Sequence, residues 1–367
     1  MKKIIIAPDS FKGSLSAIEV CRAVKEGLLE KGDFEIEEIP VADGGEGTVD
    51  SFLSIFGGEE VFAEVKGPLF KNITARYAFL NNETAVIEMA SASGLTVEKE
   101  KKPMRATTYG TGQLILSALE KGAKRIVLGI GGSATTDGGV GCAQALGARF
   151  LRKDGKEISL GGEGLLELSE IDLKGLDRRL SETELLVLCD VKNSLYGKNG
   201  AAYVFASQKG ASEEEIEVLN RALKNLAEVS EKALKKDYAF CEGAGAAGGL
   251  GFACIAFLGG KLVSGIDYVL KSADFENKAK KASLVITGEG KTDSQSLMGK
   301  VLTGITQKSG KTKVAVITGV FEGDEEAFRK IGVTQIVEVN KKHLPFEEIL
   351  ATAYEDLREA AKNIKTD

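Results

Sequence analysis

The chain contains the stretch Gly129-Ile130-Gly131-Gly132-Ser133-Ala134-Thr135-Thr136-Asp137-Gly138-Gly139, which directly follows the apolar run 125–128 and leads into small residues with helical spacing. This order predicts a strand, a glycine turn and the start of a helix. Glycines let backbone N–H groups approach a ligand, and a helix N-terminus adds a positive dipole, so the turn suits an anion such as phosphate. A tight connection without a ligand would give the same pattern.

The same layout recurs along the chain, and this recurrence predicts an α/β fold. Apolar runs that end in glycine, hydroxyl or acidic residues occur at 3–7, 35–41, 184–189, 283–286 and 313–317. Helical patterns lie between them, which is typical of parallel sheets. Between 59 and 95 the pattern alternates with a period of two around Gly67-Pro68 and Asn81-Asn82, which predicts antiparallel hairpins and the entry into a second domain.

Length and composition describe an ordinary globular protein. The 367 residues favour two or three domains, and 43% hydrophobic with 28% charged residues suits a soluble chain. The net charge of −6 carries no long charged block, which argues against nucleic acid or a membrane surface as a partner. Since no apolar run approaches the roughly 20 residues of a membrane span and the N-terminal run is too short for a signal peptide, we expect a cytoplasmic protein.

Cysteine and histidine usage restricts the chemistry. The five cysteines form no C-x-x-C pair and are expected to be reduced, buried thiols. The single histidine, His343, lies in a polar stretch before a proline, and one histidine excludes a multi-histidine metal site. Any catalysis must therefore rest on carboxylates, lysines, hydroxyls and backbone groups.

Carboxylates follow several of the predicted strands. In open α/β sheets ligands bind outside the carboxyl ends of the strands. There the chain places Asp9 with Lys12, Asp43 with Glu46, Asp137, Asp190, and Glu289 with Asp293. Singly, each could be a turn residue or a helix cap. Together with anion-binding glycine turns, they are what Mg²⁺-dependent phosphoryl transfer requires.

Two other classes of function compete with this interpretation. The pattern Gly129-x-Gly131-x-x-Ala134 fits a dinucleotide fingerprint, with Asp154 as a possible ribose ligand, so an NAD-dependent dehydrogenase is the main alternative. No histidine is placed to handle a proton in hydride transfer, and the fingerprint leaves the other carboxylates unexplained. A binding or sensor protein is disfavoured because clustered carboxylates repel each other without a metal. Gly290-Lys291-Thr292 is not a P-loop, since Val285 occupies the position of its first glycine.

Seven motifs resemble the type 1 glycerate kinase family, whose members phosphorylate D-glycerate with ATP. The resemblance covers essentially the whole chain. Lys291-Thr292, Ser194 and Met298 depart from the family pattern, the last at a position where histidine is common. The matching motifs are Ala7–Ser16, Val41–Thr48, Glu88–Leu95, Thr108–Gly112, Gly129–Gly139, Cys189–Val191 and Thr287–Gly290.

The resemblance implies a two-domain α/β enzyme with its active site in the interdomain cleft, ATP and Mg²⁺ as cofactors, and glycerate as a small-molecule substrate. Each domain is expected to hold a largely parallel sheet flanked by helices: 1–60 with 265–367 as a discontinuous Rossmann- or flavodoxin-like domain, and 61–264 as an inserted domain with hairpins. We expect a monomer or homodimer. The sequence does not choose between the 2- and 3-hydroxyl of glycerate, although the family leans toward 2-phosphoglycerate.

Specific roles are assigned on this basis. Asp190, then Asp137, is expected to accept the hydroxyl proton, and Lys12 or backbone donors to hold the glycerate carboxylate. Asp43, Glu289 and Asp293 are the expected Mg²⁺ ligands. The residues expected to bind glycerate or nucleotide are Asp9, Ser10, Lys12, Gly110, Thr111, Gly112, Gly131, Gly132, Ser133 and Gly288.

Overall fold

The structure is a computed structural model that describes residues 1–297, 300–340 and 345–366. Within these residues the chain divides into two compact units. Unit 1 comprises Met1–Ala42, Asp50–Phe56 and the chain from Gly265 onward, and unit 2 comprises Asp43–Val49 and Gly57–Ser264. The segment 43–49 thus belongs to unit 2, although the expected boundaries placed it in the first domain. Met298, Gly299 and His343 lie outside the described residues.

Unit 1 holds a parallel sheet in the order β13-β12-β11-β1-β2. Numbered along the unit, this is the doubly wound order 2-1-3-4-5, in which the connections reverse direction between β1 and β11. Its elements are β1 (Lys2–Ile6), α1 (Ala17–Leu29), β2 (Phe34–Glu38), α2 (Thr48–Phe56), α9 (Gly265–Ser272), α10 (Phe275–Ala279), β11 (Leu284–Asp293), α11 (Lys300–Ser309), β12 (Lys313–Glu322), α12 (Glu325–Lys330), β13 (Val333–Glu338), α13 (Phe346–Leu350) and α14 (Ala353–Ala361).

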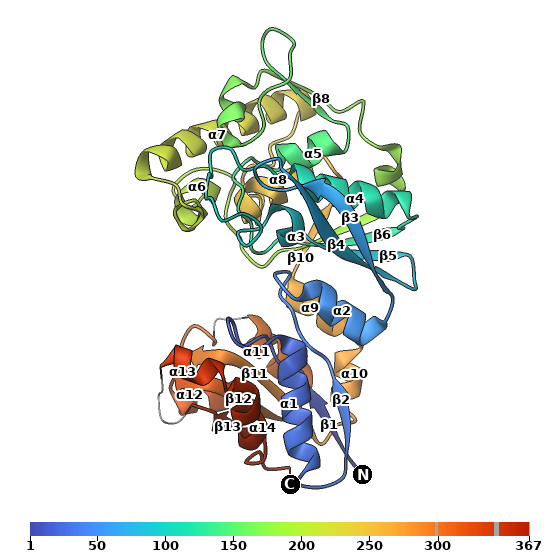
Figure 1. The fold of residues 1–367 in the computed structure, drawn as a ribbon, viewed down its shortest axis with the longest axis vertical. Coiled ribbons are helices and arrows are strands. Elements are labelled where there is room, and N and C mark those ends of the chain that lie inside the picture. Colours follow the sequence, from blue (N-terminus) through green and yellow to red (C-terminus); the bar gives the residue numbers. More distant parts are fainter. Residues whose placement is uncertain (298–299, 341–344, 367) are drawn as a thin grey trace. The chain divides into compact units, whose positions relative to one another are not determined.

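Helices cover both faces of this sheet. Ile4 and Ile6 pack with α1 and α14, which lie side by side (Figure 1). Ile5, between them in sequence, points to the opposite face and packs with α9, α10 and α11. Because both faces are buried, the strands read as continuous apolar runs. Helix α1 begins with the capping box that Ser16 and Glu19 predict.

Unit 2 holds a mixed sheet in the order β10-β9-β6-β5-β4-β3. Strands β5, β6, β9 and β10 are parallel, whereas β3, β4 and β5 pair antiparallel, as the hairpin signals predict. Its elements are β3 (Glu59–Lys66), β4 (Asn72–Leu80), β5 (Thr84–Glu88), α3 (Ala90–Ser93), α4 (Tyr109–Glu120), β6 (Arg125–Gly129), α5 (Val140–Ala145), β7 (Arg149–Leu151), η1 (Gly162–Glu167), β8 (Glu170–Asp172), η2 (Arg178–Glu182), β9 (Glu184–Leu188), α6 (Ala201–Phe205), η3 (Ser207–Lys209), α7 (Glu213–Leu234), η4 (Ala246–Gly249), α8 (Leu250–Ala256) and β10 (Lys261–Val263).

Helix α5 begins at Val140, directly after the stretch 129–139, as the order of strand, glycine turn and helix predicts. The helical pattern over 346–362 predicts one closing helix, and this prediction was wrong, because the segment forms two helices, α13 and α14, which are separated at Ala351 and Thr352. None of the helices in the described part of the chain is both long and apolar enough to span a membrane.

Candidate active site

In unit 2, the loop 43–49 packs against the carboxyl ends of β6 and β9. The backbone N–H of Gly131 donates to the carbonyl of Gly44 at 3.0 Å. A Cβ on Gly131 would lie 2.7 Å from Gly45 Cα, and one on Gly44 would lie 2.7 Å from Leu188 Cβ. Gly44 also has φ of +91°, a conformation that favours glycine. The glycines of two sequence motifs are therefore required for the backbones to approach each other.

A third motif, residues 88–95, holds the same turn from another side. Leu95 N donates to Gly132 O at 3.0 Å, and Ala134 N donates to Ser93 O at 2.9 Å. Glu88, at the end of β5, accepts a 2.7 Å hydrogen bond from Val49 N. Three motifs that are far apart in sequence therefore meet at the carboxyl ends of β5, β6 and β9, the edge where ligands bind in such sheets.

Asp137 organises the segment that follows the turn. Its side chain is 1% exposed. The two carboxylate oxygens accept hydrogen bonds from Thr107 Oγ1, Thr108 N, Thr108 Oγ1, Gly139 N and Gly141 N, at 2.7–3.3 Å. Burial raises the pKa of Asp137, and the hydrogen bonds from Thr108 and the two glycines oppose that shift. These bonds join the motif 108–112 to the stretch 129–139.

The residues Gly110, Thr111 and Gly112 lie in α4 and are buried. A Cβ on Gly110 would collide with Lys66 O, and one on Gly112 would collide with Cys142 O. Thr111 Oγ1 and Ser93 Oγ are hydrogen-bonded at 2.8 Å. Close packing of α4 accounts for both glycines, so their presence is no evidence for a ligand.

Asp190 lies two residues beyond the end of β9, and its two carboxylate oxygens are inaccessible to solvent. It is therefore placed just past the carboxyl end of the strand that neighbours β6 in the sheet. The structure does not favour the dinucleotide-binding alternative, because a dinucleotide-binding fingerprint needs a helix that begins within the glycine turn. Residues 131–134 form a turn and a bridge to Gly94, and no helix begins there.

Sequence reasoning missed Lys209, the last residue of η3, whose side chain is 2% exposed. Its ammonium donates to Ser133 Oγ at 2.8 Å and to Thr135 O at 2.6 Å. Lysine is rarely buried so fully. No local motif marks this residue, because its partners are 74 and 76 positions away in the chain.

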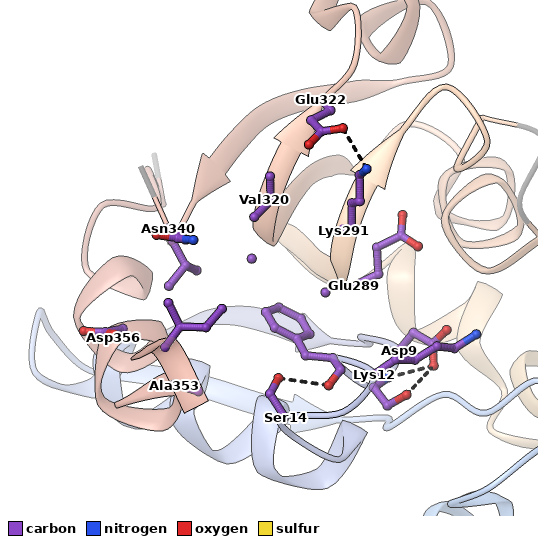
Figure 2. Close-up of a pocket in the computed structure, with 16 residues that line it drawn as sticks. Asp9, Lys12, Ser14, Glu289, Lys291, Val320, Glu322, Asn340, Ala353 and Asp356 are labelled. Atoms are coloured by element: carbon purple, nitrogen blue, oxygen red, sulfur yellow. Dashed lines mark hydrogen bonds and ion pairs between the residues drawn. The ribbon is translucent and has the colours of Figure 1, made fainter. Parts of the chain in front are cut away.

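In unit 1, a pocket of about 810 Å³ opens at the carboxyl ends of β1, β11 and β12 (Figure 2). It lies where the strand order reverses, between β1 and β11, which is the expected ligand position in a doubly wound sheet. Asp9, Ser10, Lys12 and Glu289 all line it, as the sequence predicts for a ligand site. Apolar side chains, among them Phe11 and Val320, form part of the wall.

The turn after β1 is shaped by its own hydrogen bonds. Asp9 N donates to Gly288 O at 2.9 Å, and Asp9 Oδ1 accepts from Ser10 N at 2.7 Å. Ser14 Oγ donates to Phe11 O at 3.0 Å (Figure 2). Gly288 has no room for a side chain, because a Cβ there would collide with Ile317 O on β12. Its role is therefore explained by the close pairing of β11 and β12.

Glu289 and Asp293 lie on β11, which continues through both residues beside β12. Burial raises the pKa of Glu289, the charge of Asp293 adds to the shift, and hydrogen bonds from Ser296 and Thr292 oppose it. Carboxylate oxygens are the ligands that Mg²⁺ prefers, and a bound cation relieves the repulsion between two neighbouring carboxylates. Glu289 and Asp293 therefore fit a Mg²⁺ ion. Among residues 1–297, 300–340 and 345–366, no three His, Cys, Asp or Glu side chains are grouped so as to hold a metal ion. Asp43, the third expected ligand, is exposed and belongs to unit 2.

Comparisons with known proteins identify the family of the chain. The sequence pattern of the glycerate kinase family matches residues 4–367. Glycerate 2-kinase from Escherichia coli K12 is 45% identical over 99% of this chain and 97% of its own length. Glycerate kinase from Bacillus subtilis 168 is 44% identical over 99% of this chain and 96% of its own.

A solved structure shares the fold as well as the sequence. The crystal structure of a proposed glycerate kinase 2 from Salmonella typhimurium LT2 superposes with a TM-score of 0.87 at 42% identity, covering 99% of this chain and 96% of that one. This confirms the predicted α/β class, with mostly parallel sheets flanked by helices. The chain therefore belongs to the glycerate kinase family, and it is an enzyme of the kinase class.

Proposed function

We propose that this kinase transfers the γ-phosphoryl group of ATP to D-glycerate in a Mg²⁺-dependent reaction, and that its product is 2-phosphoglycerate. The convergence of three family motifs at one edge of the unit 2 sheet carries this proposal. The name of the Escherichia coli relative, glycerate 2-kinase, supports the choice of the 2-hydroxyl. The carboxylate-rich pocket of unit 1 supports a reaction in which positioning and charge neutralisation do most of the catalysis.

Asp190 is the proton acceptor in this proposal. As the glycerate hydroxyl oxygen forms its bond to the γ-phosphorus, the bond from that phosphorus to the bridging oxygen of ADP breaks, and the hydroxyl proton passes to the Asp190 carboxylate. Asp190 is favoured over Asp137 because the oxygens of Asp137 already accept five hydrogen bonds. Asp137 is instead the residue that shapes the neighbouring turn.

Each unit offers donors for anionic groups of the ligands. In unit 2 the backbone of Gly131 and Gly132 and the hydroxyl of Ser133 are the proposed donors. In unit 1 Lys12 is exposed at the pocket and supplies a positive charge, beside Ser10 and Asp9. Lys12 and the glycine turn are the two candidates for the glycerate carboxylate and the ATP phosphates.

Glu289 and Asp293 are the proposed Mg²⁺ ligands within unit 1, and Asp43 is the candidate from unit 2. When bound, Mg²⁺ neutralises charge on the phosphate oxygens. The chain's own contribution is to hold the Glu289 carboxylate at the pocket, where burial raises its pKa and a cation would favour its charged form.

The function is tested by incubating the purified protein with ATP, Mg²⁺ and D-glycerate and by identifying the product with ³¹P NMR. A 2-phosphoglycerate signal is the expected result. A 3-phosphoglycerate signal would correct the regiochemistry and keep the kinase. ATP that remains intact in the presence of glycerate, with NAD⁺ reduced in a parallel sample, would overturn the proposal.

The proton acceptor is tested with Asp190→Asn. Loss of a general base should lower kcat by about 10²- to 10⁴-fold, while nucleotide binding persists. Asp154→Asn is the matched control, because Asp154 is an exposed aspartate of the same unit and also the ribose ligand of the dehydrogenase alternative. A near-normal kcat in Asp190→Asn would remove Asp190 from this role.

A further inference from the structure

Lys209 is a buried cation that the proposed chemistry does not use. The 3₁₀ helix η3 delivers it, and Gly210, with φ of +94°, ends that helix. Only 2% of the residue is exposed, so its ammonium has given up nearly all contact with water. A buried ammonium is costly unless polar groups of the protein replace its hydration. Ser133 and Thr135 supply the polar groups that replace the hydration of the Lys209 ammonium, and both belong to the stretch 129–139.

The two contacts hold the turn in addition to the motif 88–95. Gly132 O and Ala134 N are hydrogen-bonded to Leu95 N and Ser93 O. Lys209 donates to Ser133 Oγ and Thr135 O, at 2.8 and 2.6 Å. Four consecutive residues of the turn are thus each held by a contact from another segment. A segment held in this way keeps one conformation when a ligand arrives.

The direction of the bond to Ser133 determines what its hydroxyl can do. An ammonium has no lone pair, so Ser133 Oγ must accept from Lys209. The hydroxyl hydrogen of Ser133 is then left to donate elsewhere. Within the described part of the chain it has no protein acceptor, although the residue is only 7% exposed. A buried hydroxyl with an uncommitted hydrogen is poised to donate to a ligand oxygen.

We propose that Lys209 is a positioning residue: it holds the turn 131–135 in one conformation and orients the Ser133 hydroxyl as a donor to an anionic oxygen of the ligand. This inference rests on the proposed function, because that function assigns the turn to ligand binding. Lys209 itself touches no reacting atom in this scheme. It acts through Ser133 and through the Thr135 carbonyl.

The test uses Lys209→Met, which removes the donor and keeps an unbranched buried side chain, and Lys209→Arg, which keeps a cationic donor. Lys224→Met is the control, since Lys224 is an exposed lysine of α7 in the same unit and lies 3.8 Å from Glu228 on the same helix. Lys209→Met should lower kcat/KM by up to about 100-fold, since a misplacement of roughly 1 Å in a site can cost that much. The loss should be larger for one of the two substrates, the arginine variant should recover part of it, and Lys224→Met should behave as wild type.

A double-mutant cycle with Ser133→Ala separates positioning from a purely structural role. If Lys209 acts through Ser133, the double variant should lose much less than the product of the two single losses. Independent effects would overturn the inference, as would a folded Lys209→Met protein with wild-type kcat/KM. Wild-type protein that forms no phosphoglycerate would overturn the proposed function and this inference together, so the two failures are distinguishable.

If Lys209→Met does not fold, the pH profiles of wild type and Ser133→Ala give the same test. Burial lowers the pKa of Lys209 to about 7, and the charge of Asp137 opposes this shift. The other charged groups that line the same small hollow as Lys209 are Glu98, Glu100, Lys101 and Lys102. A neutral amine can accept the Ser133 hydrogen, so wild-type kcat/KM should fall as the pH rises through the pKa of Lys209. This decline should be absent in Ser133→Ala, and its persistence there would overturn the inference.

Discussion

In unit 1 most of the candidate residues line an open pocket, whereas in unit 2 the stretch 129–139 and the residues that hold it bond to one another. Lys12 is exposed and Glu289 is half-buried at the pocket, ready to meet a ligand. Asp137 and Lys209 are almost fully buried, and both form hydrogen bonds with backbone groups of the stretch 129–139. Substitutions of the pocket residues in unit 1 should therefore alter binding and leave folding intact, whereas substitutions of Asp137 and Lys209 in unit 2 should alter folding as well.

The largest effect is expected from Asp137→Asn. The amide nitrogen of asparagine would face N–H and O–H donors, leaving buried groups unsatisfied, so unfolding should become easier by about 2–4 kcal/mol. Urea unfolding followed by circular dichroism measures this, with the exposed Asp154→Asn as the control. If Asp137→Asn is as stable as wild type but has lost turnover, Asp137 would be a proton acceptor like Asp190. The contrast between the two units would then not hold.

The next effect is a pH dependence of stability that comes from Lys209. Burial lowers its folded pKa to about 7, below the ordinary 10.5. Between these values the unfolded chain keeps a proton that the folded chain has released, so this group makes stability rise with pH, by at most about 1.4 kcal/mol per pH unit. Below that window both states are protonated and the cost of the buried charge is greatest.

The measurement compares urea unfolding of wild type and Lys209→Met at about pH 7 and about pH 9, inside that window. The difference between the two proteins should move in favour of wild type at the higher pH. Other titrating groups are common to both proteins and cancel. A constant difference would mean that the Lys209 ammonium is not destabilised by its burial.

In unit 1, Glu289→Gln should change metal binding and leave the fold intact. Loss of a proposed ligand should weaken Mg²⁺ binding by at least the roughly tenfold that loss of an outer-shell partner causes. Titration calorimetry with Mg²⁺ and nucleotide measures this directly, and the Mg²⁺ dependence of turnover measures it again. The unfolding midpoint should be unchanged or slightly higher, since burial already disfavours the charged carboxylate. A marked loss of stability in Glu289→Gln would show that this pocket residue of unit 1 also supports the fold, contrary to the difference expected between the two units.

The smallest effect is expected from Arg329→Met in α12 of the same unit. Arg329 is exposed and forms a 3.3 Å ion pair with Glu325, and neither residue lines the pocket. Ion pairs in water contribute little to stability. Neither the unfolding midpoint nor the Mg²⁺ affinity should change measurably. This variant is the matched control for Glu289→Gln, and a large change in it would show that charge anywhere on unit 1 controls the metal.

Local sequence patterns predicted the strands and the residues at their ends, because burial on both faces makes the strands uniformly apolar. Asp9, Lys12 and Glu289 were placed at a strand edge from this pattern, and they line one pocket. The capping boxes at Ser16 and Ser212 were likewise readable, because both partners lie within four residues. Whether these pocket residues bind the ligands stays a prediction.

Other features depend on contacts that no short segment contains. Lys209 has the local sequence of a surface lysine, and only its partners 74 and 76 residues away explain its burial. Gly110 and Gly112 suggested a phosphate loop, yet they are explained by the approach of Lys66 and Cys142. The contacts that residues 132–135 form with the motif 88–95 and with Lys209 likewise join segments that are far apart in sequence.

The order of strands in unit 1 has a consequence for the synthesis of the chain. Strand β1 is the second strand from one edge of its sheet, and its partner on one side, β11, pairs Leu284 with Ile4. When β1 leaves the ribosome, that partner has yet to be translated, and the whole of Gly57–Ser264 emerges between them. The N-terminal strand must therefore wait with an unpaired apolar edge while unit 2 is made. A nascent chain of this kind is exposed to aggregation for most of its translation, and chaperones that shield N-terminal segments should matter more for it than for a chain whose sheets close in order.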